Sequence, residues 1–437
     1  MIPFVFKRDD SVDHEVVKGY QSTYNYIMRF CGLYPDFRGF WYYISGAHLN
    51  TVHLAYIWFL AAYMISTYYA FAYRDMDLLS YELCYGLVTL IWFTVTHYTI
   101  YKRDQLDSLF RKVGRGFFTY EKPIDSEEEA IIDECNTNCR KTFQKTLALT
   151  TILAFWTCII PPLPKAVMGD YSSIVEGGVP VNKHLALPTW NPYPTDTHLT
   201  YWTMWMYQAL AGCTEAYIIG ATCILYCNFC TIINRELKLL RFSLGNIKNR
   251  AIHAFKMRGY SLQLGQKYEN SQLYQVCLVH CIDESIKHHI ELKQFHGAIQ
   301  NLLGFPIFAI FSGSALTISS PMFMFLQMIG EHEESSFTLV MNIFQYTIII
   351  FGFTYFLANY CLFGQSITDE SALLHFAFYD TPWPEAGLNF RRKVLMGMIH
   401  SRKPFVLTAH GLASASSETL VDMLKTVYSY FNLLAAT

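Results

Sequence analysis

Residues 339–363 read LVMNIFQYTIIIFGFTYFLANYCLF, and this stretch contains no acidic or basic side chain. A helix that spans a membrane needs about 20 mostly apolar residues. The whole chain follows the same pattern, because its 437 residues are 52% apolar and only 16% charged. Soluble domains carry roughly a quarter charged residues. The sequence therefore predicts an all-α integral membrane protein with no soluble domain.

Seven segments of the chain are long and apolar enough to be predicted as transmembrane helices. Polar connectors separate them, and the last segment is the least apolar of the set. No apolar signal-peptide core occurs in residues 1–20, so we expect the first span to act as the insertion signal. The seven segments are predicted near 47–71, 79–101, 143–164, 199–230, 298–326, 338–363 and 408–435.

The basic residues predict how these helices are oriented. Of the 33 Lys and Arg residues, 29 lie in the N-terminal segment and in the connectors after the second, fourth and sixth spans. The other connectors hold 3, and Lys425 lies inside the last span. Cytoplasmic loops carry the excess of Lys and Arg. We therefore expect a cytoplasmic N-terminus and an extracellular C-terminus, which is opposite to the orientation of G-protein-coupled receptors.

The connectors on the predicted cytoplasmic side are long, and they contain apolar residues at helical spacing. They are expected to continue the fourth and fifth spans as helices below the membrane, and Pro382 and Pro384 are expected to break the later connector. This layer is either an assembly platform or a connector, and its apolar faces favour assembly. The predicted segments are a cytoplasmic N-terminal segment 1–46, helices one to four 47–230, a cytoplasmic helical anchor 231–297, helices five and six 298–363, a second anchor segment 364–407, and helix seven 408–437.

The composition and motifs of the sequence argue against several functions. The net charge is −2 and no basic tail occurs, so we expect no nucleic-acid partner. No catalytic motif occurs, so we predict neither an enzyme nor a cofactor. Cys223, Cys227 and Cys230 have helical spacing, but no His or carboxylate joins them, which favours helix packing over a metal site. A transporter would predict inverted repeats, and the sequence contains no detectable repeat.

The last third of the chain carries an ordered set of short motifs. Each one is weak alone, but their order and spacing together are specific. This set resembles the C-terminal signature of the insect odorant receptor family, and gustatory receptors, which share its topology, differ at the last motif. The motifs are YCLFG at 360–364, Glu-Ser at 370–371, Trp383, FRRKVL at 390–395, RKPFVLTA at 402–409 and YSYF at 428–431.

The resemblance implies a ligand-gated, non-selective cation channel in the plasma membrane of sensory neurons. Members usually assemble as tetramers with a co-receptor. A small volatile odorant binds within one subunit, in the outer half of the bundle among helices embedded in membrane lipids, and opens a central pore. The family's co-receptor has a longer second cytoplasmic loop, so this chain resembles a tuning subunit of a heterotetramer. A gustatory-type receptor channel and, less favoured, a membrane transporter remain as alternatives.

The resemblance also implies that the seventh helix lines the pore. Asp422, Lys425 and Thr426 interrupt the apolar sequence of this helix. Ser429 and Asn432 interrupt it again nearer its end. Such polar residues suit a water-filled path, although contacts between packed helices would also explain them. An acidic outer loop, with Glu331, Glu333 and Glu334, either concentrates cations or is simply solvated. The candidate pore and gate residues are Ser429, Asn432 and Leu433.

Helical spacing within the second, third, fourth and sixth spans selects candidate pocket residues for the implied ligand. Ordinary helix packing is an equal alternative for each of them. The outer loop 165–198, rich in Pro and Gly, either caps such a pocket or is a passive surface loop. Glu215 is a further candidate, because ionisable residues inside a membrane are often functional. The candidate pocket residues are Val88, Trp92, Leu149, Ile152, Trp156, Tyr207, Ala211, Ile343 and Tyr346.

Overall fold

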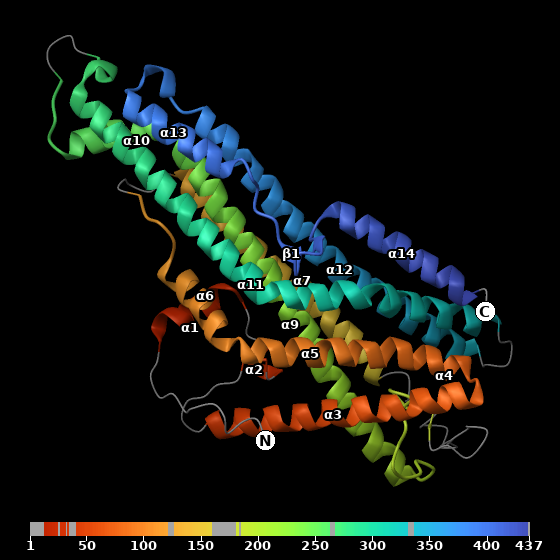
Figure 1. Ribbon diagram of the computed structural model, residues 1–437. Helices are drawn as coiled ribbons and strands as arrows, with labels where there is room; N and C mark the ends of the chain where they lie inside the picture. The colour runs from red at the N-terminus through yellow and green to blue at the C-terminus, as the bar shows by residue number, and fades with distance from the viewer. Residues whose placement is uncertain are drawn as a thin grey trace.

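The computed structural model shows long helices in two connected regions, a bundle and an arm that extends from it (Figure 1). The helices α9, α11 and α12 belong to both regions, because each leaves the bundle and continues into the arm. This arrangement confirms the predicted all-α fold. The structure describes residues 13–24, 27–31, 33–34, 41–120, 126–159, 181–182, 185–262, 267–330 and 336–435.

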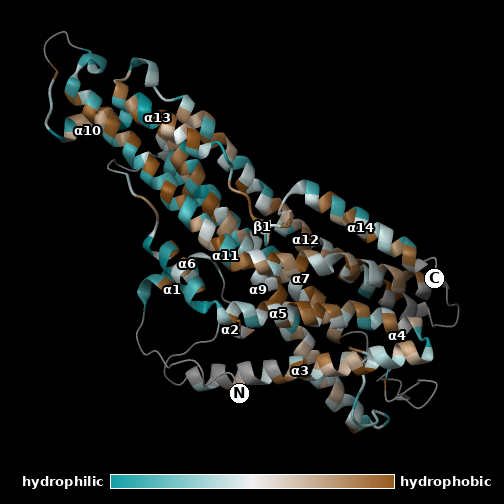
Figure 2. Cartoon of the chain, in the orientation of Figure 1, coloured by the Kyte–Doolittle hydropathy of each residue, from teal (hydrophilic) through white to brown (hydrophobic). Residues whose placement is uncertain are grey.

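Helical structure occurs at all seven segments that the sequence predicts as spans. Figure 2 shows that apolar residues dominate these bundle helices, whereas the arm and α6 are more mixed. The helices of the bundle are α3 (Trp41–Tyr73), α4 (Met76–Tyr81), a π-helical turn η1 (Glu82–Gly86), α5 (Leu87–Tyr101), α7 (Ser126–Ala154) with a π-helical turn η2 (Phe155–Ile159), α9 (His198–Gly245), α11 (Gln272–Gly330), α12 (Ser336–Tyr379) and α14 (Ser417–Ala435).

Five of the described helical stretches are long and apolar enough to cross a membrane. The predicted third and seventh spans, which correspond to α7 with η2 and to α14, fall outside this set. Residues 160–164 of the third prediction lie outside the described residues. The five stretches are Leu54–Tyr73, Leu78–Tyr101, His198–Gly245, Gln272–Leu326 and Ile343–Glu385.

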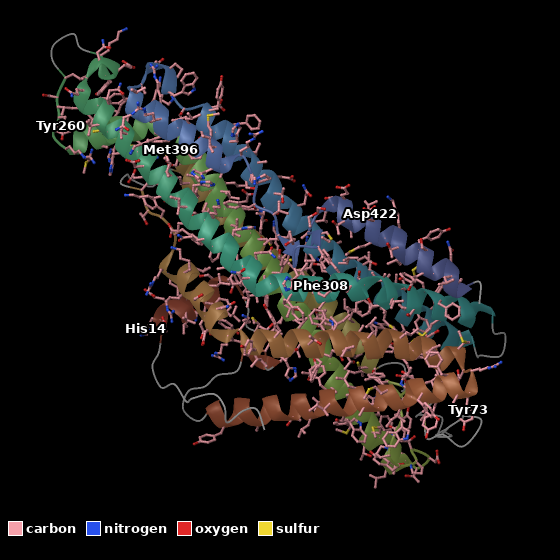
Figure 3. All side chains as sticks on the ribbon, in the orientation of Figure 1. His14, Tyr73, Tyr260, Phe308, Met396 and Asp422 are labelled. Carbon is pink, nitrogen blue, oxygen red and sulfur yellow. The ribbon has the colours of Figure 1, made fainter. Side chains whose placement is uncertain are left out.

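The arm and the segments before α3 and α7 are built from shorter helices packed on the long ones. The chain turns after Tyr379, in the Pro382–Pro384 region that the sequence predicts as a break. Within α11, Pro306 lies close to Phe308, where Figure 3 shows the helix changing direction between arm and bundle. The shorter elements are α1 (His14–Ser22), α2 (Ile27–Phe30), α6 (Arg103–Arg115), α10 (Ile247–Met257), η3 (Tyr268–Asn270), η4 (Trp383–Glu385) and α13 (Leu388–Ser401).

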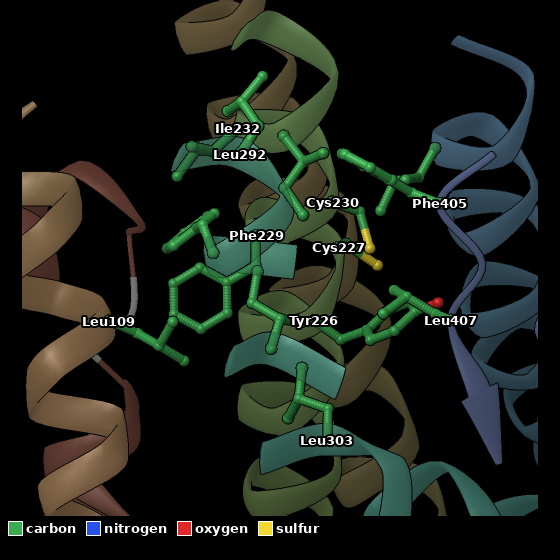
Figure 4. Close-up of a cluster of buried hydrophobic side chains, with 14 of the residues drawn as sticks. Leu109, Tyr226, Cys227, Phe229, Cys230, Ile232, Leu292, Leu303, Phe405 and Leu407 are labelled. Carbon is green, nitrogen blue, oxygen red and sulfur yellow. The ribbon is translucent and has the colours of Figure 1, made fainter. Parts of the chain in front are cut away.

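The core lies where the bundle meets the arm, and Figure 4 shows part of it. Tyr226 and Phe229 of α9 are fully buried there, among side chains of α6, α11 and residues 405–407, which follow α13. The Tyr226 hydroxyl donates a hydrogen bond to the backbone oxygen of Tyr360 on α12, at 2.8 Å. This contact satisfies a buried hydroxyl group and joins two of the long helices.

A short β-hairpin precedes the last helix, where the sequence predicts continuous helix from residue 408. Strand β1 (Thr408–Ala409) pairs antiparallel with β2 (Ala413–Ser414), and α14 begins only at Ser417. The Gln300 side chain of α11 bonds both the N–H group and the oxygen of Thr408, at 2.8 and 2.9 Å. The hairpin therefore fixes the start of α14 against the middle of α11.

Candidate ligand-binding site

Among the described residues of the helix bundle, two cavities are lined by Glu215 of α9. The first has a volume of about 100 Å³ and lies between α3 and α9. Its walls are mostly apolar, with one carboxyl group, two threonines and two tyrosines. The residues that line it are Thr51, Ala55, Tyr56, Phe59, Tyr207, Leu210, Ala211, Thr214 and Glu215.

The second cavity has a volume of about 70 Å³ and is lined by more elements than the first. Helices α3, α5, α7, α9 and α12, both π-helical turns and the loop before α9 contribute to it. The residues that line it are Tyr63, Tyr85, Val88, Thr89, Leu153, Thr157, Cys158, Leu187, Gly212, Glu215, Ala216, Ile219, Ile349, Phe353 and Phe356.

Glu215 has one satisfied carboxyl oxygen and one that has no partner. The Thr89 hydroxyl of α5 donates a hydrogen bond to its Oε2 at 3.2 Å. Its Oε1 is buried and has no hydrogen-bond partner among the described residues. The described residues that line the two cavities include no Lys, Arg or His. The arrangement can therefore accept a hydrogen bond from a small molecule.

The described part of the loop before α9 reaches into the bundle and contributes to the second cavity. Leu187 lines that cavity, and its backbone bonds the Gln208 side chain of α9 in both directions, at 3.0 and 2.8 Å. The backbone N–H group of Trp190 donates to the Ser66 hydroxyl of α3 at 2.6 Å. These bonds hold the described part of the loop against two helices of the bundle.

The structure brings three of the nine candidate pocket residues to these cavities. Val88 lines the second cavity, whereas Tyr207 and Ala211 line the first. Tyr207 also stacks on Phe59, with ring centroids 5.5 Å apart. Ligand contact at these residues stays a prediction.

The other six candidates lie outside the walls of the two cavities. Trp92 is buried in the main core, and Leu149 is half-buried on α7. Ile152 is exposed on the bundle surface. Ligand contact at these positions therefore stays an untested prediction.

The three remaining candidates lie on or against α12. Trp156 stacks on Phe344, with ring centroids 5.8 Å apart. Ile343 and Tyr346 belong to a separate apolar cluster with Ile349. Ile349 also lines the second cavity, so this cluster adjoins the site.

The participation of α3 was not predicted from the sequence. Four of its residues, Thr51, Ala55, Tyr56 and Phe59, line the first cavity, and Tyr63 lines the second. Phe59 and Tyr63 are spaced i, i+4, so the same spacing argument could have selected them. Because α3 is apolar on all sides, however, no face stands out as the one that faces a pocket.

The candidate pore residues lie on the accessible surface of α14. Ser429, Asn432 and Leu433 are all exposed, and Leu433 is 61% exposed. Val427 of the same helix is only 4% exposed and belongs to the main core. One side of α14 thus packs on the chain and the other does not. The acidic residues Glu331, Glu333 and Glu334 lie outside the described residues.

The three cysteines considered as metal ligands are buried in α9. Cys223 and Cys227 have sulfur atoms 3.9 Å apart, and Cys230 lies in the core shown in Figure 4. No group of three His, Cys, Asp or Glu residues in the described part of the chain could hold a metal ion. All twelve cysteines are free thiols.

Long apolar helices around small internal cavities define this chain as a multi-span, all-α membrane protein with room for small ligands. Its fold is similar to that of the olfactory receptor OR5 from Machilis hrabei in complex with eugenol, with a TM-score of 0.75 at 13% identity, over 97% of this chain and 100% of that one. A second structure of the same receptor matches with a TM-score of 0.72 at 13% identity, over 97% of this chain and 99% of that one.

Sequence comparison defines the family. A family model described as 7tm Odorant receptor matches residues 75–428, so the chain belongs to the insect odorant receptor family. It is 28% identical to Odorant receptor 2a of Drosophila melanogaster over 39% of this chain and 41% of that relative. It is 22% identical to Odorant receptor 85b of the same organism over 58% of this chain and 57% of that relative. The matches thus span about half the length of these relatives.

Proposed function

We propose that this chain is the odorant-binding subunit of a ligand-gated, non-selective cation channel. A small volatile molecule binds within the helix bundle, and its binding opens a pore lined by α14. The family membership and the two cavities that share Glu215 support an odorant-binding role. Mostly apolar cavities with few polar groups suit molecules of this kind.

The exposed side of α14 is the observation that supports the pore most directly. Ser429 and Asn432 are spaced i, i+3, and Leu433 follows one residue later, so the three share a side of the helix. Polar side chains are costly against lipid and favourable along a water-filled path. Asp422, labelled in Figure 3, forms an exposed ion pair with Lys425 at 3.1 Å, which also requires a polar environment. Leu433 would close the path by excluding water.

Assembly with other subunits is supported by the surface of the arm. Large apolar side chains are exposed there on α12 and α13, including Phe376, Met396 and Ile399. Exposed apolar patches of this kind mark protein interfaces in water. The proposed partner is the family's co-receptor, in a heterotetramer that has the arm on the cytoplasmic side. That orientation follows the Lys and Arg distribution in the connectors.

Electrical recording with and without the co-receptor tests this proposal. The full chain is expressed in a cell, its surface delivery is confirmed, and currents are recorded during application of a broad panel of volatiles. We expect a non-selective cation current that is evoked by an odorant and requires the co-receptor. Silence under every condition, with the protein present at the surface, would refute the channel proposal.

A further inference from the structure

Glu215 combines a buried carboxyl oxygen that lacks a partner with two adjoining cavities. A buried acceptor that receives no hydrogen bond is energetically unfavourable. The single hydrogen bond from Thr89 occupies Oε2 and leaves Oε1 available. A molecule that occupies either cavity is therefore beside an acceptor that the described protein does not satisfy.

Two other buried carboxylates in the described residues are paired within the chain. Glu284 forms an ion pair with Arg250, and Glu236 contacts Arg235 and lies 3.3 Å from His288. No such charged partner is found for Glu215 in the part of the chain that the structure describes. An isolated buried charge is strongly unfavourable, so the group needs either a proton or a hydrogen-bond donor from a ligand.

Glu82 provides the comparison that separates a ligand site from an ordinary buried acid. Its two carboxyl oxygens are also buried without a hydrogen-bond partner in the described part of the chain. Glu82, however, lines neither cavity, whereas Glu215 lines both. The adjoining space makes Glu215 the carboxyl group that a ligand can reach.

We propose that the ligand is a small, mostly apolar molecule with one hydrogen-bond donor, a hydroxyl or an amine, which it donates to Glu215 Oε1. This inference rests on the proposed odorant-binding function. The apolar walls of the cavities contact the skeleton of the ligand, through side chains such as Phe59 and Leu153. The carboxyl group discriminates donors from isosteric molecules that lack one, because an unpaired buried acceptor penalises the latter.

Two matched trios of molecules test the donor requirement. They are hexanol, hexylamine and hexyl methyl ether, and phenethyl alcohol, phenethylamine and phenethyl methyl ether. Binding is measured by thermal unfolding of the purified full-length protein across ligand concentrations, and evoked current is measured in cells with the co-receptor. In at least one trio, we expect the alcohol or the amine to bind at least about tenfold more tightly than the ether.

Three variants assign this preference to Glu215. The E215L variant has no acceptor, and we expect it to lose the preference while still binding the ether. The E215Q variant keeps an acceptor oxygen without a charge, and we expect it to keep the preference for an alcohol and to lose that for an amine. The matched control is E82Q, which makes the same change outside the cavities and should behave as the unmodified chain.

The outcomes separate this inference from the channel proposal. Ethers that bind as tightly as alcohols and amines would overturn the inference, and so would an unchanged preference in E215L and E215Q, or no binding by either trio. Binding with a donor preference but without current refutes only the channel. Current without a donor preference refutes only the role of Glu215.

Discussion

The hydroxyl groups of Tyr81 and Tyr346 lie 2.6 Å apart and join α4 to α12 across the bundle. Tyr346 is buried, and its ring packs in the apolar cluster that adjoins the second cavity. This hydrogen bond links the first half of the sixth predicted span to the start of the second. It therefore gives a specific way to measure how firmly the helices around the site are held.

Replacing either tyrosine with phenylalanine should weaken this connection. We expect Y346F to lower the free energy of unfolding by about 1 kcal/mol, because one buried hydrogen bond is lost. The Y81F variant removes the same bond, so the double variant should cost little more than either single one. Thermal unfolding of the purified protein measures all three. Strictly additive effects would show that the two hydroxyl groups do not interact.

The contact between α1 and α6 depends on two glycines that pack against opposing backbone. A Cβ atom at Gly114 would overlap the backbone oxygen of Glu15, and one at Gly19 would overlap that of Phe110. Because backbone cannot move aside as a side chain can, we expect G114A to destabilise the protein by about 3 kcal/mol or to release α1. Unfolding and limited proteolysis near α1 measure this change.

Gly245, at the end of α9, supplies the matched control. A Cβ atom there would meet no other atom within 4 Å, so G245A should be neutral or slightly stabilising. Equal effects of G114A and G245A would contradict the close approach of α1 and α6.

A buried ion pair holds α10 against α11 in the arm. Arg250 and Glu284 have side chains only 3% and 8% exposed, and Arg250 also bonds the hydroxyl of Ser243 at 2.6 Å. The guanidinium carbon of Arg250 lies over the Tyr120 ring, 4.2 Å from the centroid of that ring. Burial raises the pKa of Tyr120, so its hydroxyl stays protonated at neutral pH.

Removing one partner of this pair should leave an uncompensated buried charge. We expect R250M to lower the free energy of unfolding by about 3–5 kcal/mol. An exposed pair between the arm elements, Lys248 and Glu385, is the matched control, since its side chains are 49% and 56% exposed. The K248M variant should change stability by less than about 1 kcal/mol. Similar losses in both variants would mean that burial of the pair does not matter.

The helices and their continuation into the arm could be predicted from the sequence, because hydropathy and spacing are local properties of the chain. The hairpin before α14 could not, since Thr408 is held by Gln300, which is distant in sequence. The candidate pocket residues show the same limit. Spacing correctly grouped Tyr207 with Ala211 on one side of α9, but which helix faces them depends on tertiary packing, and that helix is α3.

The central claim, that α14 lines a ligand-gated pore, is tested most directly by cysteine modification during odorant-evoked current. A charged thiol reagent is applied to S429C and to V427C, which places a cysteine on the buried side of the same helix. Eleven of the twelve natural cysteines are buried and Cys213 is half-buried. The effect of the reagent on the current of the unsubstituted chain therefore serves as the background. We predict that the reagent reduces the current of S429C and leaves V427C at background. Loss of current in both variants, or in neither, would contradict a pore lined by α14.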